Sequence, residues 1–331
     1  MSLICRKLML LVVVLIAGVT RARADCWRGP AATYRLDMVM GRVVVSPDLP
    51  VGAVIAQHSW TMPAGMGINY SCFGKNTFRA SIVATGVTSI GNGIYSTAVP
   101  GIGIRFSRGG NKVNIMYPGQ YTVNADKKSD YRLEGSRFTV ELIKTAAVTG
   151  SGPLAAGEYT SYDWEHGYNP ILKTFLSANA VTVVSPSCTI LSGRNMNVDV
   201  GSIRRSDLKG TGKTAGGKDF SIRLQCSGGL SESGYASIHI SFSGNPATGT
   251  ETGQGVLLNE KTGSGMAQGV GIQVLKEGTP LKFNSRYETG RLTSQGMRYI
   301  SVPLRARFYQ YAPDITTGEV ESHMVFNLTY D

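Results

Sequence analysis

Hydrophobic and polar residues alternate at every second position over many short stretches of this chain. This is the pattern of a β-strand that buries one of its two faces. Such stretches occupy residues 43–45, 102–106, 138–142, 220–226, 238–242, 270–274 and 300–308. Clusters of Gly, Asn, Ser and Pro separate them at short intervals, and only residues 206–209 suggest a helical turn. The pattern therefore predicts an all-β fold of antiparallel sandwiches rather than βαβ units.

The last fourteen residues, 318–331, carry the most distinctive strand pattern. Every second residue from 324 to 330 is large and apolar: Met324, Phe326, Leu328 and Tyr330. Polar residues take most of the opposite face. A long apolar edge without a partner promotes aggregation, and natural proteins avoid it. Either this strand is buried within a sheet, or the chain expects a strand from another molecule.

Residues 1–24 have the features of a secretory signal peptide. Arg6 and Lys7 supply the positive region, residues 8–19 the apolar core, and Ala22-Arg23-Ala24 a small-x-small cleavage site. About a dozen apolar residues are too few for a transmembrane helix, which needs about 20. We therefore expect an exported mature chain that begins at Asp25.

Export also determines the expected role of the cysteines. After residues 1–24 are removed, four cysteines remain: Cys26, Cys72, Cys188 and Cys226. An even number in an exported chain favours disulfides, and pairing within each half avoids joining residues more than a hundred positions apart. Metal binding is the competing interpretation, but the chain has no C-x-x-C motif and no histidine near either pair. We therefore predict the disulfides Cys26–Cys72 and Cys188–Cys226.

Length and pattern together predict two domains. A mature chain of about 300 residues suits two domains of ordinary size. The boundary is expected within 176–182, because the loop-rich stretch 150–170 precedes it and residues 181–188 have the pattern of a first strand. The predicted units are residues 25–178 and residues 179–331.

Charge and motifs argue against several function classes. The chain carries 33 basic and 22 acidic residues, and without residues 1–24 the balance is 29 to 22, a net charge of +7. Because no cluster of basic and aromatic residues concentrates this charge, we expect no nucleic-acid partner. There is no G-x-S-x-G elbow, and residues 210–214 lack the first glycine and the helix of a P-loop. We expect neither enzyme activity nor a cofactor.

The histidines give no sign of a metal site. The four of them, His58, His166, His239 and His323, share no ligand spacing. His239 and His323 lie on the polar faces of strands and are expected to be solvated.

An aromatic-rich stretch in the first half is the main candidate for receptor binding. It combines Tyr159, Tyr162, Trp164 and Tyr168 with Asp163, Glu165 and His166, between flanking Gly and Pro residues. On an exposed loop, aromatic side chains with a polar tip suit stacking on carbohydrate or on a Pro-rich triple helix, and they serve as interface anchors. The alternative is a loop whose tyrosines pack back onto the sandwich.

Arg105 and Trp60 are two further candidates in the first half. Arg105 lies in an apolar, glycine-spaced run, so it is either a donor in a binding pocket or an outward-facing strand residue. Trp60 is expected in the core rather than in a site.

Four features of residues 181–331 occur together. They are Cys188 in the first strand, Cys226 closing the run Phe-Ser-Ile-Arg-Leu-Gln-Cys, Gly318 fourteen residues from the end, and the penultimate Tyr330. This combination resembles the pilin domain of chaperone–usher fimbriae. The resemblance implies an incomplete immunoglobulin-like sandwich without its last, seventh strand. It also implies a periplasmic chaperone that lends a strand alongside residues 320–330, an outer-membrane usher, and a next fimbrial subunit that replaces the chaperone strand. The implied acceptor residues are Gly318, Val320, Met324, Phe326, Leu328, Tyr330 and Asp331.

The energetics of strand burial agree with this expectation. Burying the four large apolar side chains of the last strand is worth ~6–12 kcal/mol gross. The whole net stability of a domain is only ~5–15 kcal/mol. An uncovered groove would therefore leave the second domain barely folded. The carboxylate of Asp331 is a candidate anchor for basic residues of the chaperone.

Residues 25–178 stand where an ordinary pilin carries its donor strand, so the chain can accept a strand but has no evident strand to give. Further motifs lie at residues 41–52, 95–107, 255–263 and 306–313. With them, the mature chain resembles the type 3 fimbrial tip adhesins (MrkD-like). The resemblance implies a receptor-binding, lectin-like sandwich in the first domain and a place at the tip of cell-surface fimbriae. It also implies adhesion to host extracellular matrix, collagen in some variants, or to glycans, and support of biofilm growth.

Two other functions remain open from the residues alone. A secreted structural or enzymatic sandwich would pair its last strand internally and would need a catalytic constellation. A shaft or minor adaptor subunit would need a donor extension at its mature N-terminus, and residues 25–30 are too short for one.

Overall fold

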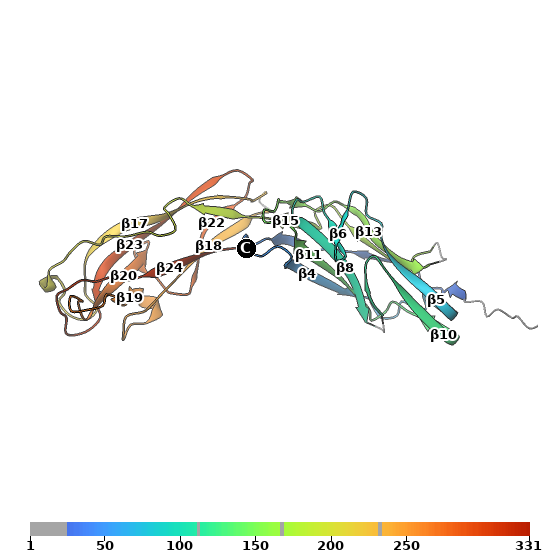
Figure 1. The fold of residues 1–331 in the computed structure, drawn as a ribbon, viewed down its shortest axis with the longest axis horizontal. Coiled ribbons are helices and arrows are strands. Elements are labelled where there is room, and N and C mark those ends of the chain that lie inside the picture. The colour runs from blue at the N-terminus through green and yellow to red at the C-terminus, as the bar shows by residue number, and fades with distance from the viewer. Residues whose placement is uncertain (1–24, 111–112, 166–168, 231–233) are drawn as a thin grey trace, which may run out of the picture.

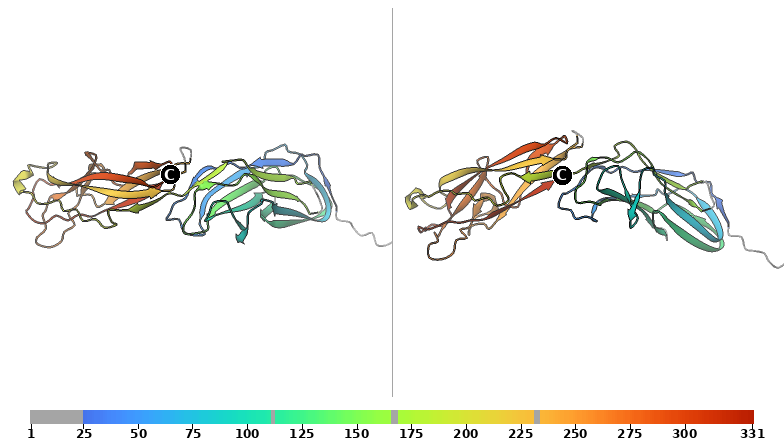
Figure 2. Two further views of the ribbon diagram at one scale, coloured as in Figure 1. Left: turned by 90° about the horizontal axis from the view of Figure 1, so that it is seen from above. Right: turned by 45° about the horizontal axis from the view of Figure 1, so that its top comes forward.

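The computed structural model describes residues 25–110, 113–165, 169–230 and 234–331. Two β-sandwiches lie end to end, which gives the molecule an elongated outline (Figure 1; Figure 2). The helical structure in the described residues is limited to two 3₁₀ turns, Arg205–Asp207 and Thr252–Gln254. The all-β prediction is confirmed, and the helical turn expected at 206–209 is present one residue earlier. None of the described residues forms a helix long and apolar enough to cross a membrane.

The first sandwich contains two sheets. One has the order β1 (Asp25–Arg28), β5 (Tyr70–Ile82), β13 (Gly157–Trp164), β14 (Leu172–Leu176) and β2 (Tyr34–Asp37), and β10 (Gly119–Tyr131) also pairs with β5. The other has the order β4 (Val54–Thr61), β11 (Arg137–Lys144), β8 (Ile102–Gly110), β7 (Ile94–Ser96) and β6 (Ser89–Gly91), and β9 (Val113–Met116) also pairs with β8. The aromatic rings of Phe106, Phe138 and Tyr117 pack between the sheets.

A small sheet joins the two domains. Its order is β12 (Gly152–Pro153), β15 (Val181–Val184) and β3 (Gly41–Val44). The single strand expected over 181–188 is in fact two strands, because Pro186 has no N–H to donate and interrupts the ladder. Val181 and Val183 lie in the first core and Val184 in the second. The hydrogen bonding of the first domain thus continues beyond residue 178.

The second sandwich also contains two sheets. The larger has the order β16 (Ser187–Ile190), β17 (Thr214–Ser227), β23 (Arg298–Gln310), β20 (Val270–Lys276) and β19 (Val256–Leu257), and β21 (Thr279–Pro280) also pairs with β20. The smaller has the order β22 (Arg286–Leu292), β18 (Ala236–Gly244) and β24 (Met324–Tyr330). The strands predicted at 220–226, 238–242, 270–274 and 300–308 all lie within these elements.

Both predicted disulfides are confirmed. Cys26 bonds Cys72 between β1 and β5, and Cys188 bonds Cys226 between β16 and β17. In each pair the two cysteines are directly opposite one another in an antiparallel ladder. Each bridge therefore ties the first strand of its domain to a central strand.

Candidate functional site

The aromatic-rich stretch predicted as an exposed loop is a strand of the first core. Tyr159 and Tyr162 lie on β13 and are only 4% and 2% exposed. The hydroxyl of Tyr159 donates to the carbonyl oxygen of Ala155 at 2.9 Å, and the Tyr162 ring stacks on Phe78. The prediction that these two tyrosines stand on an exposed receptor-binding loop is therefore wrong, and the alternative that they pack onto the sandwich is correct.

The other residues of the aromatic-rich stretch differ in their surroundings. Trp164 is partly buried and packs against the first core, while His166 and Tyr168 lie outside the described residues. Asp163 lies opposite Arg79, and burial raises the pKa of the Asp163 carboxyl although Arg79 opposes the shift. Trp60 also packs against the core, as expected, with its ring 4.5 Å from that of His58.

Arg105 is an outward-facing residue on β8. Its neighbours Ile104 and Phe106 point into the core, so Arg105 lies on the opposite face of the sheet. Its Nε donates to Glu141 Oε2 at 2.7 Å, and the two side chains are 25% and 19% exposed. The ion pair holds the guanidinium in one position on the sheet surface. Of the two alternatives for Arg105, the outward strand position is the observed one.

The surface around Arg105 combines polar and apolar groups. In the ladder Arg105 stands between Ile94 on β7 and Glu141 on β11. Met116 is 45% exposed and lies beside Gly93 together with the Arg105 side chain. We call the surface formed by exposed Met116 and by half-buried Ile94, Arg105, Thr139 and Glu141 the outer face.

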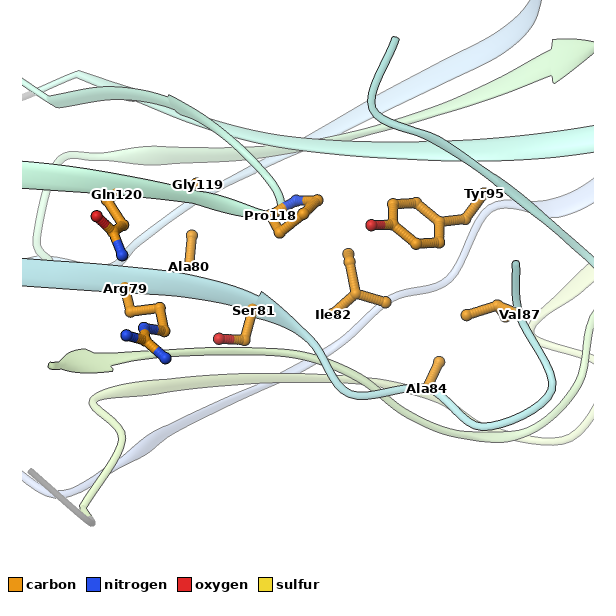
Figure 3. A pocket seen from close by; sticks show the side chains of 10 residues that line it. All are labelled: Arg79, Ala80, Ser81, Ile82, Ala84, Val87, Tyr95, Pro118, Gly119 and Gln120. Atoms are coloured by element: carbon orange, nitrogen blue, oxygen red, sulfur yellow. The ribbon is translucent and has the colours of Figure 1, made fainter. Parts of the chain in front are cut away.

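A shallow pocket lies at the edge of the first sandwich, between β5, β7 and the start of β10. It has a volume of about 640 Å³ and is lined by Arg79, Ala80, Ser81, Ile82, Ala84, Val87, Tyr95, Pro118, Gly119 and Gln120. In Figure 3 the Tyr95 hydroxyl points across the pocket toward Pro118 and Ile82. Sequence reasoning missed this pocket because its lining comes from three separate segments that share no motif.

The last strand forms one edge of the second sandwich. Among the described residues, β24 pairs only with β18. Its inward side chains, Met324, Phe326, Leu328 and Tyr330, are half-buried against the second core. The directly opposite core residues on β18, Ile240 and Phe242, are fully buried. The edge is thus open on the side away from β18.

A second row of half-buried side chains faces the same core. It consists of Cys188, Ile190, Met196, Val198, Val200 and Ile203, on β16 and the irregular segment that follows it. β16 pairs only with β17 among the described residues. The Tyr330 hydroxyl reaches the Cys188 backbone, and burial raises the Tyr330 pKa despite this contact. We call the half-buried surface formed by this row and the inward side chains of β24 the acceptor groove.

The residues that flank β24 are already engaged within the second domain. A Cβ atom at Gly318 would lie 2.5 Å from the Gly265 carbonyl oxygen, so only glycine fits there. Val320 is half-buried against the second core. The Asp331 carboxylate pairs with Arg286 at 2.6 Å and lies 3.4 Å from His239.

The histidines differ from one another more than expected. His323 is exposed and pairs with Glu260 at 2.7 Å, but the His239 side chain is only 18% exposed. The expectation that His239 is solvated is wrong, because the end of β24 and its Asp331 cover it. No group of His, Cys, Asp and Glu in the described residues has the arrangement of a metal site.

Two family matches divide the chain a few residues before the first core ends. Residues 36–179 match the MrkD-like receptor binding domain, and residues 178–331 match the fimbrial protein family. The end of the first match meets the start of the second between the two sandwiches.

The chain is also similar to individual proteins. The fimbria adhesin protein of Klebsiella pneumoniae is 56% identical over 328 residues, which cover 98% of this chain and 100% of that protein. Protein FhaE of Bordetella pertussis is 30% identical over 143 residues, 41% of this chain and 36% of that protein. The crystal structure of the receptor binding domain of the plasmid-born adhesin MrkD1P of Klebsiella pneumoniae is 49% identical. The match covers 51% of this chain and 100% of the chain in that crystal structure, with a TM-score of 0.45. The chain therefore belongs to the MrkD-like fimbrial adhesins and is a tip adhesin of cell-surface fimbriae, with a receptor-binding domain followed by a fimbrial domain.

Proposed function

We propose that the first domain attaches the bacterium to host extracellular matrix, with collagen as one candidate, or to host glycans, and that this attachment supports biofilm growth. The observation that carries the proposal is the fixed Arg105 guanidinium on the outer face. Arginine is enriched among the residues that dominate binding energy at interfaces. Its ion pair with Glu141 uses one of five donors, which leaves others for carbonyl or hydroxyl groups of a ligand.

The composition of the outer face fits a long, rod-like ligand better than a small molecule. A sheet surface is broad, and Ile94 and Met116 provide apolar contact beside the Arg105 side chain, on the edge of β8 away from Glu141. Because the ion pair already orders the guanidinium, binding would cost little further side-chain entropy.

Binding of the mature chain to an array of matrix proteins and glycans tests this proposal. We expect Arg105→Ala to weaken binding by about tenfold or more, the usual loss for a central interface arginine. Arg35→Ala is the matched control, since Arg35 is an exposed, ion-paired arginine on β2 of the other sheet. Equal binding by the two variants would remove the outer face from consideration.

The second domain is the proposed joint to the fibre. The acceptor groove would take an extended strand, first from a periplasmic chaperone and then, after passage through the outer-membrane usher, from the next fimbrial subunit. Both walls of the groove offer unpaired strand edges and alternating apolar side chains, as strand addition requires. Asp331 pairs with Arg286 of its own domain, so basic chaperone residues would share this carboxylate rather than find it free.

Substitution of one inward residue of β24 tests the joint. Leu328→Asp places a charge in the groove, and we expect it to prevent capture by the chaperone and to leave the chain to proteolysis. Thr329→Asp is the control, because Thr329 is exposed on the other face of the same strand. A Leu328→Asp chain that accumulates as a stable monomer without chaperone would contradict donor-strand addition.

A further inference from the structure

Arg108 is a buried arginine without a carboxylate partner. It follows Ile104 and Phe106 on the inward face of β8 and is 3% exposed. No carboxylate among the described residues forms an ion pair with it, whereas Arg105, half-buried on the same strand, pairs with Glu141. Burying an uncompensated charge is costly, so such groups are nearly always paired. The position therefore calls for an explanation.

The contacts that Arg108 does make are with neutral groups. One terminal nitrogen donates to Ser136 Oγ at 3.3 Å, and the guanidinium carbon lies 4.2 Å from the centre of the Tyr162 ring. The Nε atom is buried and has no hydrogen-bond partner. The cation–π contact offsets part of the burial cost, but none of these groups neutralises the positive charge.

Two further buried polar groups belong to the surroundings of Arg108. The Tyr117 hydroxyl interacts with the Arg108 guanidinium, and the Asn69 side-chain nitrogen has no hydrogen-bond partner. Asn69 is connected to Arg108 through hydrogen bonds by way of Leu133 and Ser136. Burial raises the Tyr117 pKa despite the nearby Arg108, so this hydroxyl stays neutral and does not offset the positive charge. The Arg108 Nε and the Asn69 nitrogen are buried donors without partners, and the donor on the cation would gain from a nearby anion.

Arg108 lies in the wall of a pocket of about 600 Å³. The pocket opens between β10, β9 and β13, and in Figure 1 the ends of β5 and β10 lie at the end of the molecule away from the second domain. Its aromatic lining consists of Phe78, Tyr121, Tyr131 and Tyr162, and its polar lining includes Thr122, Asn124, Ser129 and Asp130. This volume lies within the range of ordinary small-ligand sites, about 300–1,000 Å³.

We propose that this pocket binds a sugar that carries a carboxylate, such as a hexuronic acid or a sialic acid unit of a glycan. The ligand carboxylate would take the unpaired edge of the Arg108 guanidinium, whose planar donors match a carboxylate. Phe78 and Tyr131, with ring centres 5.7 Å apart, would contact the apolar face of the sugar ring. Asn124, Ser129 and Asp130 would bond its hydroxyl groups.

This site is separate from the outer face around Arg105. Arg105 and Arg108 stand on opposite faces of β8, one toward solvent and one toward the interior. Loss of one site therefore leaves the other in place. The two proposals can fail independently.

The first test needs no variant. The full mature chain, held by its chaperone, is titrated with glucuronate and with glucuronamide, which replaces the carboxylate by a neutral amide of nearly the same shape. We expect glucuronate to bind at least about tenfold more tightly, as charge-assisted hydrogen bonds predict. Equal affinity for the two, or no binding of either, would overturn the proposal. Binding of glucose 6-sulfate as tight as that of glucuronate would overturn the assignment to a carboxylate.

The second test assigns binding to Arg108. Arg108→Met keeps most of the side-chain volume and removes the charge, so we expect an unchanged or higher melting temperature and at least about tenfold weaker glucuronate binding. Arg79→Met is the control, since Arg79 is an exposed arginine on β5 that pairs with Glu165. Glucuronate binding that survives Arg108→Met would show Arg108 to be structural only. If Arg108→Met does not fold, the comparison of glucuronate with glucuronamide on the unaltered chain decides alone.

Discussion

The two sandwiches enclose their cores to different extents. In the first domain, burial is complete along central strands such as β11, where Phe138 and Leu142 are fully buried. In the second domain, Ile240 and Phe242 on β18 are equally buried, but one strand further across, on β24, burial falls to half. The edge strand β4 of the first domain is also only partly buried, but its inward positions carry Ala56, His58 and Trp60. The difference teaches that the second domain leaves a row of four large apolar side chains incompletely covered along the β24 edge. The binding and anchoring tasks follow this division.

A strand supplied in cis should remove most of this difference. We predict that an Asn-Gly turn and an alternating Val/Thr strand, appended after Asp331, will pair antiparallel with β24. Completing the burial of the ten half-buried side chains of the acceptor groove, four on β24 and six in the second row, should raise the unfolding free energy of the second domain by roughly 5–10 kcal/mol. Denaturant unfolding of the chaperone-free chain measures this gain. The same extension with Asp at its inward positions is the control, and equal stability of the two would show that the groove needs no strand.

Removing each disulfide in turn distinguishes the loss of chain entropy from the loss of structure in the acceptor groove. The two disulfides close loops of 46 and 38 residues, so chain entropy alone predicts a similar cost of about 4 kcal/mol for the loss of either. Only Cys188, however, lies in a wall of the acceptor groove. We expect the double substitution Cys188→Ser, Cys226→Ser to abolish chaperone capture as well. Cys26→Ser, Cys72→Ser should destabilise the first domain and leave capture intact, and pull-down by the chaperone distinguishes the two outcomes.

Substitutions in β15, a strand of the small sheet that joins the two domains, test where the first domain ends. Val183 lies beyond residue 178, yet it is fully buried in the first core. We predict that Val183→Ala will destabilise the first domain by about 2 kcal/mol, the usual cost of a small core cavity. The half-buried neighbour Thr182 provides the control Thr182→Ala. Unfolding of the isolated segments 25–178 and 25–184 checks the same point. Equal stability of these two segments would place the limit of the first domain at 178.

Most of the fold could be predicted because alternation reports burial directly. Strands such as 238–242 and 300–308 keep strict period-two patterns, and each is a long core strand. The open edge at β24 was visible for the same reason. The disulfides followed from the count of cysteines and the distance between the pairs. The limit of the first domain was harder to place, because the pairing of β15 with β3 joins residues about 140 positions apart in sequence.

The prediction of the receptor site failed where the alternation of apolar and polar residues is interrupted. A bulge between Glu158 and Thr160 shifts the register of β13, so Tyr159 and Tyr162 both face inward although three positions separate them. The flanking Gly and Pro residues then favoured a loop. Arg108 was not considered from the sequence, because the predicted strand ended at residue 106. In the structure Arg108 continues the inward series Ile102, Ile104 and Phe106, and a charged residue in such a series indicates a buried polar position.

The smallest predicted effect concerns the segment just before β24. His323 hydrogen-bonds Glu260 and thereby lowers the Glu260 pKa below its usual value. A lowered carboxyl pKa contributes stability above the unfolded-state pKa, and this contribution is lost as the pH falls through the lowered folded-state pKa. Because His323 is exposed, we expect His323→Asn to cost the second domain no more than about 0.5 kcal/mol near pH 6. Near pH 3 we expect the difference to vanish, and Asp314→Asn, at an exposed acid of the same domain, to show no such pattern. A loss of the same size at both pH values would assign the effect of His323 to packing beside the acceptor edge rather than to the charge on Glu260.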